Sequence, residues 1–370
     1  MNSLYKDLIY LLTCSVNKFI PEKEKIYNMD LDNIYKISKF NSVSATICIA
    51  LENAGIKDER FIQDYKKSVR KNIMLDIERK AIFKDFENNQ IWYMPLKGSV
   101  LKDIYSENGM RQMADNDILF NKKMQNNVKN IMLERGYKVT EFRKNHHDVY
   151  MKKPIYNFEL HTDLFARNFD KKIYNYYKDI KIKLKKDEGN NYGYHFSDED
   201  FYVYITAHEW KHYNMLGSGI RSLLDCYVYL KNKRENLNWE YINKQVKELG
   251  INDFEEKRRN LALKVFSTKE LPHLNKDEIE MLEFYLLSGT YGNFENNIRR
   301  KLKGQSKFSF IMHSIFIPRN QMEQSVKFTS KSILLYPIGV IWRCFRIVLF
   351  RRKKLKITIA EVKKNDKKKI

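Results

Sequence analysis

Apolar residues repeat at helical spacing through most of the chain. They recur every three or four positions over residues 1–90, where Gly55 interrupts the pattern and residues 58–88 form one long, strongly charged segment. The same spacing returns after residue 198. There it defines five further helical segments, at residues 201–212, 220–230, 239–249, 254–266 and 277–287. We therefore expect helical regions on both sides of a different middle segment.

Residues 90–165 show short apolar runs separated by turns. The runs are rich in aromatic and β-branched residues, which favour strands. They cover residues 91–96, 113–120, 137–142, 148–152 and 156–163. Two helical segments lie among them, at residues 100–105 and 121–135, and the second has Asn121 as its cap and Gly136 at its end. This order predicts one mixed sheet and, with the flanking helices, an α+β fold.

These changes of pattern divide the chain into four parts. A helical N-terminal region covers residues 1–89, and a small sheet domain covers residues 90–185. A polar loop leads to a helical C-terminal domain at residues 198–318, and residues 319–370 form a basic amphipathic tail. A chain of 370 residues is long enough for such an arrangement with a sizeable core.

The composition fits a folded protein of a reducing compartment. Apolar residues make up 43% of the chain, and only 13 glycines and 6 prolines are present, which excludes a disordered chain. The cysteines lie far apart in apolar segments, so we expect buried free thiols at Cys14, Cys48, Cys226 and Cys344. The N-terminus does not show the pattern of a signal peptide, and we expect a cytoplasmic protein.

Much of the formal net charge of +22 lies in the tail. Residues 319–370 hold 15 lysines and arginines against 3 acidic residues, a net charge of +12. Such a concentration indicates an anionic partner, either a lipid surface or a nucleic acid. A solvated, lysine-rich tail is the alternative interpretation.

The tail also contains an apolar stretch interrupted by Pro337, Arg343 and Arg346, which disfavour a membrane-spanning helix. The two arginines share one helical face with Lys353. This pattern favours an amphipathic helix within residues 333–356 that lies on the anionic inner face of a membrane. Binding to nucleic acid is possible but less favoured. A packed final helix with a disordered basic end is the alternative.

Two carboxylates stand close together at Asp115 and Asp117. Side chains of a strand alternate between the two faces of a sheet, so both carboxylates project to the same side. At such a separation they repel each other unless a divalent cation neutralises them. An Asp-x-Asp triplet alone is more often a solvated turn, so the motif needs support from other positions.

Lys97, Gly98 and Ser99 form a turn between the first expected strand and a helix. Gly98 lets a ligand approach the backbone, and Ser99 can hold phosphate oxygens together with the N–H groups of the helix start. Lys97 adds positive charge. Alone, these residues are an ordinary strand-to-helix turn.

The strand at residues 156–163 has two different faces. Phe158 and Leu160 form an apolar face, and Glu159 and His161 lie on the other. Such acidic faces are common on solvent-facing sheets. Beside an Asp-x-Asp strand in the same sheet, however, Glu159 can complete a cage of three carboxylates for two magnesium ions.

The order of these elements is similar to that of the DNA polymerase β-like nucleotidyltransferase superfamily. More narrowly, the run LKGSVLKDIYSENGMRQMADNDILF resembles a bacterial family described as uncharacterised nucleotidyltransferases. The resemblance covers about residues 30–290. It is carried by Leu96, Lys97, Gly98, Tyr105, Arg111, Asp115, Asp117, Glu159 and His161, and further along by His208, His212, Arg221, Leu223, Leu224 and Asp225.

The resemblance implies Mg²⁺-dependent transfer of a nucleotidyl group from an NTP, with ATP the expected donor, to a hydroxyl group of an unidentified acceptor. Asp115, Asp117 and Glu159 would be the catalytic residues and hold two Mg²⁺ ions, and Glu159 would accept the proton of the attacking hydroxyl group. Pyrophosphate would be released.

The resemblance also implies a phosphate-binding set. Gly98 and Ser99 would hold the β- and γ-phosphates, and Lys97 or Arg111 would balance the charge of the triphosphate. A nucleotide-binding accessory protein without turnover, acting at the membrane surface, for example in polysaccharide assembly, is the alternative function. The intact carboxylate set favours the enzyme.

Two features depart from the usual pattern of the superfamily. Asn116 stands where an apolar residue is more usual, so its buried side chain needs a hydrogen-bond partner. The step from Gly98 to Asp115 is longer than in the shortest members. Neither departure removes a carboxylate, and neither predicts an inactive protein.

Two histidine motifs have other interpretations. The run HEWKH, with His208, Glu209 and His212, fits the zinc-protease pattern HExxH, but no third ligand follows at the usual spacing, and we do not favour proteolysis. His146 and His147 lie in a polar stretch and are expected to be a surface pair.

Overall fold

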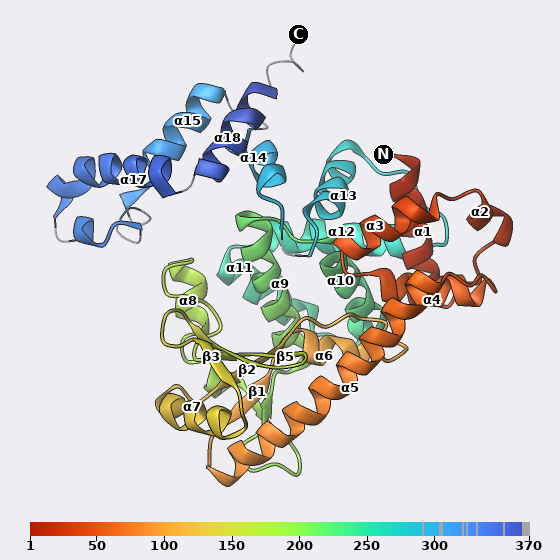
Figure 1. The fold of residues 1–370 in the computed structure, drawn as a ribbon, viewed down its shortest axis with the longest axis horizontal. Coiled ribbons are helices and arrows are strands. Elements are labelled where there is room, and N and C mark those ends of the chain that lie inside the picture. The colour runs from red at the N-terminus through yellow and green to blue at the C-terminus, as the bar shows by residue number, and fades with distance from the viewer. Residues whose placement is uncertain are drawn as a thin grey trace. The chain divides into compact units, whose positions relative to one another are not determined.

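The computed structural model describes residues 1–364 except residues 291, 303–305, 320–321, 323–324, 331 and 351. The chain divides into two compact units (Figure 1). Unit 1 comprises Met1–Lys211 and Ser218–Thr290, and unit 2 comprises His212–Gly217 and Tyr291–Ile370. Each unit has apolar clusters of its own.

Unit 1 begins with four short helices and one long helix, which confirms the helical N-terminal region. They are α1 (Ser3–Asn17), α2 (Lys23–Tyr27), α3 (Leu31–Phe40), α4 (Ser44–Asn53) and α5 (Glu59–Asn88). Asp58 caps α5 by accepting a hydrogen bond from the backbone N–H of Arg60. The buried positions of α5 include Leu75, Ile82 and Phe86, which form the stripe that packs on the sheet.

The expected mixed sheet follows α5. Its strands are β1 (Tyr93–Pro95), β2 (Asn116–Phe120), β3 (Lys138–Glu141), β4 (His147–Lys152) and β5 (Tyr156–His161). Their order is β1-β2-β5-β4-β3, in which only the β2–β5 pair is parallel. Strand β2 is shorter than the predicted strand 113–120, because pairing with β5 begins only at Asn116.

The two faces of the sheet differ because side chains alternate along each strand. One face packs against α5 and against α7 (Gln125–Glu134), and its core includes Ile118, Phe120, Tyr150 and Phe158. The same two helices lie on this side of the sheet in Figure 1. The opposite face carries Asp117, Glu159 and His161, which are among the odd-numbered positions of β2 and β5.

Short elements connect the strands and lead away from them. They are α6 (Gly98–Leu101), η1 (Lys102–Ile104), η2 (Lys122–Met124), α8 (Lys171–Tyr177), η3 (Ile180–Lys183) and the two-stranded sheet of β6 (Lys185–Lys186) and β7 (Tyr194–His195). Asn121 caps η2 rather than α7, since its side chain accepts from the N–H of Lys123.

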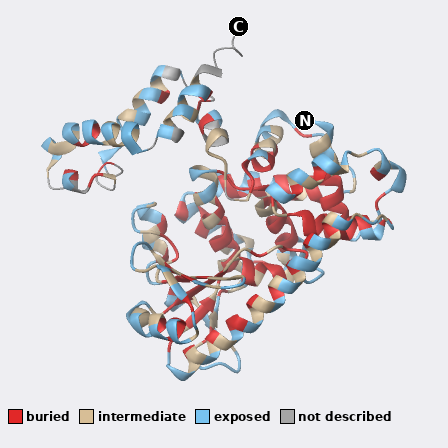
Figure 2. Cartoon of the chain, in the orientation of Figure 1, coloured by how far each residue is buried: buried red, intermediate tan, exposed pale blue. Residues whose placement is uncertain are grey.

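The remaining helices of unit 1 match the five predicted segments closely. They are α9 (Asp198–Met215, up to Lys211), α10 (Ile220–Lys233), η4 (Arg234–Asn236), α11 (Trp239–Leu249), α12 (Asn252–Phe266) and α13 (Lys276–Ser288). Buried residues fill the interior of this unit, as Figure 2 shows. An α+β fold with helices flanking a central sheet is therefore confirmed.

Unit 2 is helical over its described residues. Its elements are α14 (Phe294–Leu302), α15 (Lys307–Ile315), η5 (Lys327–Ser330), η6 (Ile333–Leu335), α17 (Tyr336–Phe350) and α18 (Arg352–Lys364). Helices α14 and α18 are joined by an ion pair between Arg299 and the buried Glu361. The predicted division at residues 318 and 319 stays a prediction.

All four cysteines lie within the described residues and are free thiols. Cys14, Cys48 and Cys226 are buried, as expected, whereas Cys344 on α17 is only half-buried.

Candidate functional site

The site lies on the face of the sheet that is turned away from α5. Asp117 of β2 and Glu159 of β5 are direct neighbours in the parallel pair, so their side chains project side by side. His161 follows two residues after Glu159, and its Nε2 lies 2.7 Å from Asp117 Oδ1 and 3.8 Å from Glu159 Oε2. These three residues offer ligand atoms within 4.8 Å of one another and could hold a metal ion.

Asp115 lies one residue before β2 and is half-buried. It interacts electrostatically with Asp117: burial and the Asp117 carboxylate raise the pKa of Asp115, and nearby Lys97, Arg221 and Lys71 lower it. Within the described part of the chain, the groups of potential metal ligands include Asp117 and Glu159 but not Asp115. The structure thus brings all three carboxylates into one neighbourhood and two of them into ligand distance.

Lys97 supplies the positive charge nearest to the carboxylates. Its backbone has a φ of 48°, in the left-handed region, and its Nζ lies 2.7 Å from Asp117 Oδ1. Burial alone would lower the pKa of Lys97, but the Asp117 carboxylate outweighs burial and keeps this pKa above its ordinary value. In the ligand-free protein, Lys97 is therefore the counterion of Asp117.

The carboxylates of the pair differ in protonation. Burial would raise the pKa of Asp117, but Lys97 and His161 outweigh burial and hold the pKa well below its ordinary value. Burial, together with the Asp117 and Asp115 carboxylates, raises the pKa of Glu159 to about 7. Asp117 is thus ionised at neutral pH, and Glu159 exchanges its proton near neutral pH.

Gly98 is required by close packing. A Cβ atom at this position would lie 2.7 Å from Arg111 Nη1 and 2.9 Å from Met113 Sδ. The Ser99 hydroxyl is buried and donates to the Leu96 carbonyl at 2.7 Å. A substitution at Gly98 would therefore disturb the packing of unit 1, and the phosphate-binding roles of Gly98 and Ser99 remain predictions.

Arg111 makes a buried ion pair with a carboxylate of α10. Its Nε and Nη2 donate to Asp225 Oδ1 and Oδ2 at 2.8 and 2.9 Å, and Tyr105 donates its hydroxyl to the same carboxylate at 2.7 Å. Three positions that carry the resemblance thus form one network between the segment from η1 to β2 and α10. This network accounts for Arg111 structurally, and its contact with a triphosphate remains a prediction.

Asn116 has the partners that its burial requires. Arg79 Nη1 donates to Asn116 Oδ1 at 2.8 Å, and Asn116 Nδ2 donates to the Leu75 carbonyl at 3.2 Å. Both partners belong to α5, and Asn116 is fully buried. This departure from the usual apolar residue therefore ties β2 to α5.

Three further basic residues surround the carboxylates. Burial and nearby Lys97 lower the pKa of Lys211, on α9, to about 8, although Glu159 and Asp117 act against them. Lys71 of α5 donates to the Ala114 carbonyl at 2.8 Å, and Arg221 of α10 donates to the Gln112 carbonyl at 2.9 Å. In the sequence, Arg221 is recognisable only as a position that carries the resemblance, and the two lysines are not recognisable, because nothing separates them from the many other lysines.

The prediction that His146 and His147 form a surface pair is wrong. Both are half-buried, and their ring centroids lie 5.6 and 5.0 Å from that of His161. The reason is pairing between strands: His147 stands directly opposite His161 in the antiparallel β4–β5 pair. Burial, followed by the charge of Lys211, lowers the pKa of His146 to about 2, and burial with Lys97 lowers that of His161 to about 4. The contact of His161 with Asp117 is therefore a hydrogen bond of a neutral imidazole.

The HEWKH run does not form a protease site. Glu209 is buried and accepts hydrogen bonds from Arg258 Nε and from the Tyr285 hydroxyl, both at 2.6 Å. A carboxylate held in this way cannot act as the base of a zinc protease. His208 and His212 belong to none of the ligand groups found among the described residues.

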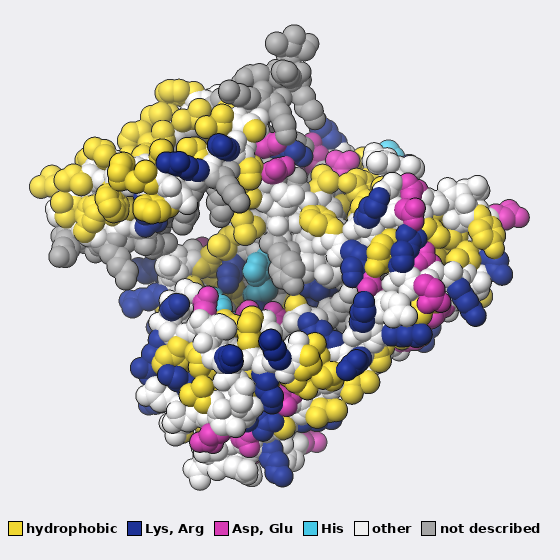
Figure 3. Space-filling model, in the orientation of Figure 1, with side chains coloured by type: hydrophobic (Ala, Val, Ile, Leu, Met, Phe, Trp, Pro, Cys, Tyr) yellow, Lys and Arg dark blue, Asp and Glu magenta, His cyan; other side chains and the backbone are white. Residues whose placement is uncertain are grey.

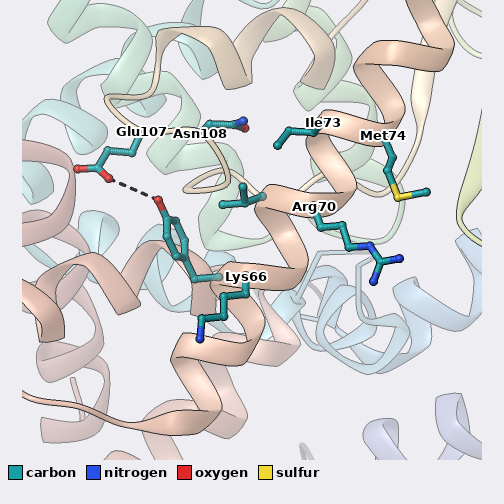
Figure 4. Close-up of a pocket in the computed structure, with 8 residues that line it drawn as sticks. Lys66, Arg70, Ile73, Met74, Glu107 and Asn108 are labelled. Carbon is teal, nitrogen blue, oxygen red and sulfur yellow. Dashed lines mark hydrogen bonds between the residues drawn. The ribbon is translucent and has the colours of Figure 1, made fainter.

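A groove elsewhere in unit 1 lies between α5 and the loop after η1 (Figure 4). The Tyr65 hydroxyl and Glu107 form a hydrogen bond across it at 3.4 Å. None of the predicted site residues lines this groove, so it is separate from the carboxylates.

One comparison with known proteins gives a match. The model of the family described as "Uncharacterised nucleotidyltransferase" matches residues 27–267, which include every predicted site residue. No curated protein and no solved structure matches the chain. The chain belongs to the uncharacterised nucleotidyltransferase family, whose general function is nucleotidyl transfer.

Proposed function

We propose that the protein is a Mg²⁺-dependent nucleotidyltransferase that uses an NTP, with ATP the expected donor, and a hydroxyl group of an acceptor. The observation that supports this most is the register of Asp117 beside Glu159, with Asp115 next to β2 and basic groups around them. Carboxylate oxygens are the ligands that Mg²⁺ prefers, so the donor set fits this ion.

Asp115, Asp117 and Glu159 would hold the ions, which neutralise phosphate charge and make the acceptor hydroxyl group more acidic. The chain itself supplies the other parts. Glu159, beside Asp117 in the parallel strand pair, would accept the proton of the acceptor hydroxyl group. Lys97 and Lys211 lie close enough to the carboxylates to affect their ionisation, and they would bind the triphosphate.

The bond changes of the reaction are those of a simple substitution. The acceptor oxygen forms a bond to the α-phosphorus, and the bond from that phosphorus to the bridging oxygen of the β-phosphate breaks. The electron pair leaves with pyrophosphate. The proton of the acceptor hydroxyl passes to Glu159 and from there to water.

The test uses the full-length protein, Mg²⁺ and ATP labelled at either the α- or the γ-phosphate, with sugars, small molecules, proteins and RNA as acceptors. Transfer of the α-label, with the γ-label in pyrophosphate, supports the proposal. Transfer of the γ-label would identify a kinase instead. Mg²⁺-dependent ATP binding without transfer to any acceptor class would favour the non-catalytic accessory protein.

We also propose that unit 2 docks on an anionic membrane surface. Figure 3 shows hydrophobic side chains gathered on this unit. On α17 the exposed ones are Ile338, Ile341, Trp342, Phe345, Val348, Leu349 and Phe350. Among the described residues, one stretch, Ile333–Phe350, is long and apolar enough to cross a membrane by length and composition. Its two arginines disfavour a spanning position.

The arginines of α17 differ from the expectation that they face lipid headgroups. Arg343 donates to the carbonyls of Ser314 and Ile315, and Arg346 donates to that of Ser325. The polar side of α17 thus contacts protein, and its apolar side is exposed. Of the predicted basic run, Arg351 and the side chains of Lys353 and Lys354 lie outside the described residues.

Co-sedimentation with vesicles tests this docking. The full chain should bind vesicles that contain anionic lipid and should be released by salt, since screening weakens the contribution of basic residues. A chain that ends at residue 330 should not bind. Equal binding to neutral vesicles, or no binding to either kind, would contradict docking on an anionic surface.

A further inference from the structure

Three histidines lie together beside the carboxylates, and the proposed transfer reaction uses none of them as a ligand. His146, His147 and His161 each offer a ring nitrogen, and the three nitrogens lie within 4.8 Å of one another. The ring centroids are 4.7, 5.0 and 5.6 Å apart. Imidazoles that share one tetrahedral ion have centroids about 5 Å apart, given metal–nitrogen bonds of about 2 Å.

The backbone holds this cluster in place. His147 and His161 are cross-strand partners, so their side chains project from the same face. The carbonyl of His146 accepts hydrogen bonds from the N–H groups of Thr162 and Asp163, at 2.9 and 3.3 Å, which fixes the end of β4 against that of β5. The three imidazoles therefore meet because of the sheet.

The Nδ1 atoms of all three histidines are buried, and no described residue gives any of them a hydrogen-bond partner. Leaving a buried polar atom without a partner is costly, and three such atoms in one cluster need an explanation. His161 is only 3% exposed, so solvent does not reach its ring freely. A cation held by this cluster would supply the kind of partner that its buried ring nitrogens lack.

His161 also has the outer partner typical of a metal ligand. Its Nε2 lies 2.7 Å from Asp117 Oδ1, and because a carboxylate oxygen accepts hydrogen bonds, this nitrogen donates. The proton on Nε2 leaves a lone pair on Nδ1. A carboxylate that fixes a histidine in this way is the common second partner of metal-bound imidazoles.

We infer that His146, His147 and His161 form a binding site for a divalent transition metal ion, with Zn²⁺ as the representative, next to the carboxylate group. Neutral imidazoles suit Zn²⁺, Co²⁺ and Ni²⁺, whereas Mg²⁺ prefers oxygen ligands. Three protein ligands leave a fourth position of a tetrahedral ion for water or substrate. The site shares only His161 with the group of Asp117 and Glu159, and it does not depend on nucleotidyl transfer.

The experiment uses the chelator-treated, full-length protein in excess Mg²⁺, with Co²⁺ as the probe. The wild-type chain should give the visible absorption bands of tetrahedral Co²⁺, and Zn²⁺ should remove them by competition. His146→Ala and His147→Ala should each weaken Co²⁺ binding by about tenfold or more. His195→Ala, which changes a histidine on β7 paired with Asp187, should leave it unchanged. Circular dichroism should show that all variants are folded.

Glu159→Gln separates the two groups of ligands. This variant should keep the Co²⁺ bands, because Glu159 is not a ligand in the proposed site. Loss of the bands in Glu159→Gln with retention in His146→Ala would place the ion on Asp117, Glu159 and His161 and overturn the inference. Absence of tetrahedral bands in the wild-type protein would overturn it as well.

Discussion

The two faces of the sheet bury polar side chains in opposite ways. Toward α5, Asn116 has a donor and an acceptor within hydrogen-bond distance, so each polar atom of its side chain has a partner. On the other face, its neighbour Asp117 lies beside Glu159, whose pKa is raised, and near imidazoles with unpartnered nitrogens. A satisfied buried group stabilises the fold, whereas a group left in unfavourable surroundings indicates a function that needs it.

The largest expected effect is on catalysis and comes from Glu159→Gln. Removing the proton acceptor and metal ligand should lower transfer by about a thousandfold. The folded protein should be at least as stable as wild type at neutral pH, because the change removes repulsion from Asp117 and Asp115. Labelled-ATP transfer and chemical denaturation measure the two quantities. Asp117→Asn is a poorer choice, since it leaves the buried Lys97 without its counterion.

The matched control is Glu141→Gln, on edge strand β3 of the same sheet, which should leave transfer unchanged. Normal transfer by Glu159→Gln would show that the carboxylate pair is not the catalytic centre and that the two faces do not differ in function.

Asn116→Ala should lower the stability of the protein and leave transfer nearly unchanged, which is the opposite of the result for Glu159→Gln. It leaves the Arg79 guanidinium with one partner fewer and the Leu75 carbonyl without its side-chain donor, at a cost of about 2 kcal/mol in the free energy of unfolding. Transfer at a temperature where the variant is folded should be close to wild type. A large loss of transfer with unchanged stability would mean that Asn116 acts in the site, and the comparison of the faces would fail.

The stability of the metal-free protein should depend on pH through Glu159. Its pKa is about 7 in the folded chain, against about 4.3 in an unfolded one. Folding therefore favours the protonated form. The stability from this group is present below about pH 4.3 and is lost as the pH rises through about 7, by roughly 3 kcal/mol.

Urea unfolding of wild type and Glu159→Gln across pH 4 to 8, in a chelator, measures this difference. In the variant, the free energy of unfolding should not show the fall with rising pH that is due to Glu159. Identical slopes in the two proteins would mean that Glu159 is not held in the unfavourable environment described.

Lys211→Gln should have the smallest effect. Removing one basic group near the carboxylates should raise the dissociation constant of Mg²⁺–ATP by roughly tenfold. Lys66→Gln, at an exposed position of α5, is the control with the same charge change. Isothermal titration calorimetry checks both. Equal affinities of the two variants would exclude Lys211 from the triphosphate site.

The sequence predicted much of the fold, because strand alternation and helical spacing are local. It placed Asp115 and Asp117 on one side of their strand, and it required a partner for Asn116. It could not show that Asp117 stands beside Glu159, because strand order and register depend on contacts distant in sequence.

The histidines and lysines of the site were harder to find. His147 meets His161 only through the β4–β5 hairpin, and in sequence the pair looks like polar surface. Lys71 and Lys211 are two of 68 basic residues. Arg343 and Arg346 show the reverse case: charge suggested that they face outward, but carbonyl groups of their own unit bind them.

The ion pair of Lys97 and Asp117 has a consequence for the order of ligand loading. A cation that binds Asp117 alone must displace Lys97, which leaves a buried ammonium group without a partner. A nucleotide that binds Lys97 alone leaves the Asp117 carboxylate without its counterion. When both arrive together, each half of the pair gains a new partner. Metal and nucleotide should therefore bind with positive cooperativity, each raising the affinity for the other by the same factor. Mg²⁺ titrations with and without a non-hydrolysable ATP analogue would measure that factor, and a value of one would show that Lys97 does not respond to either ligand.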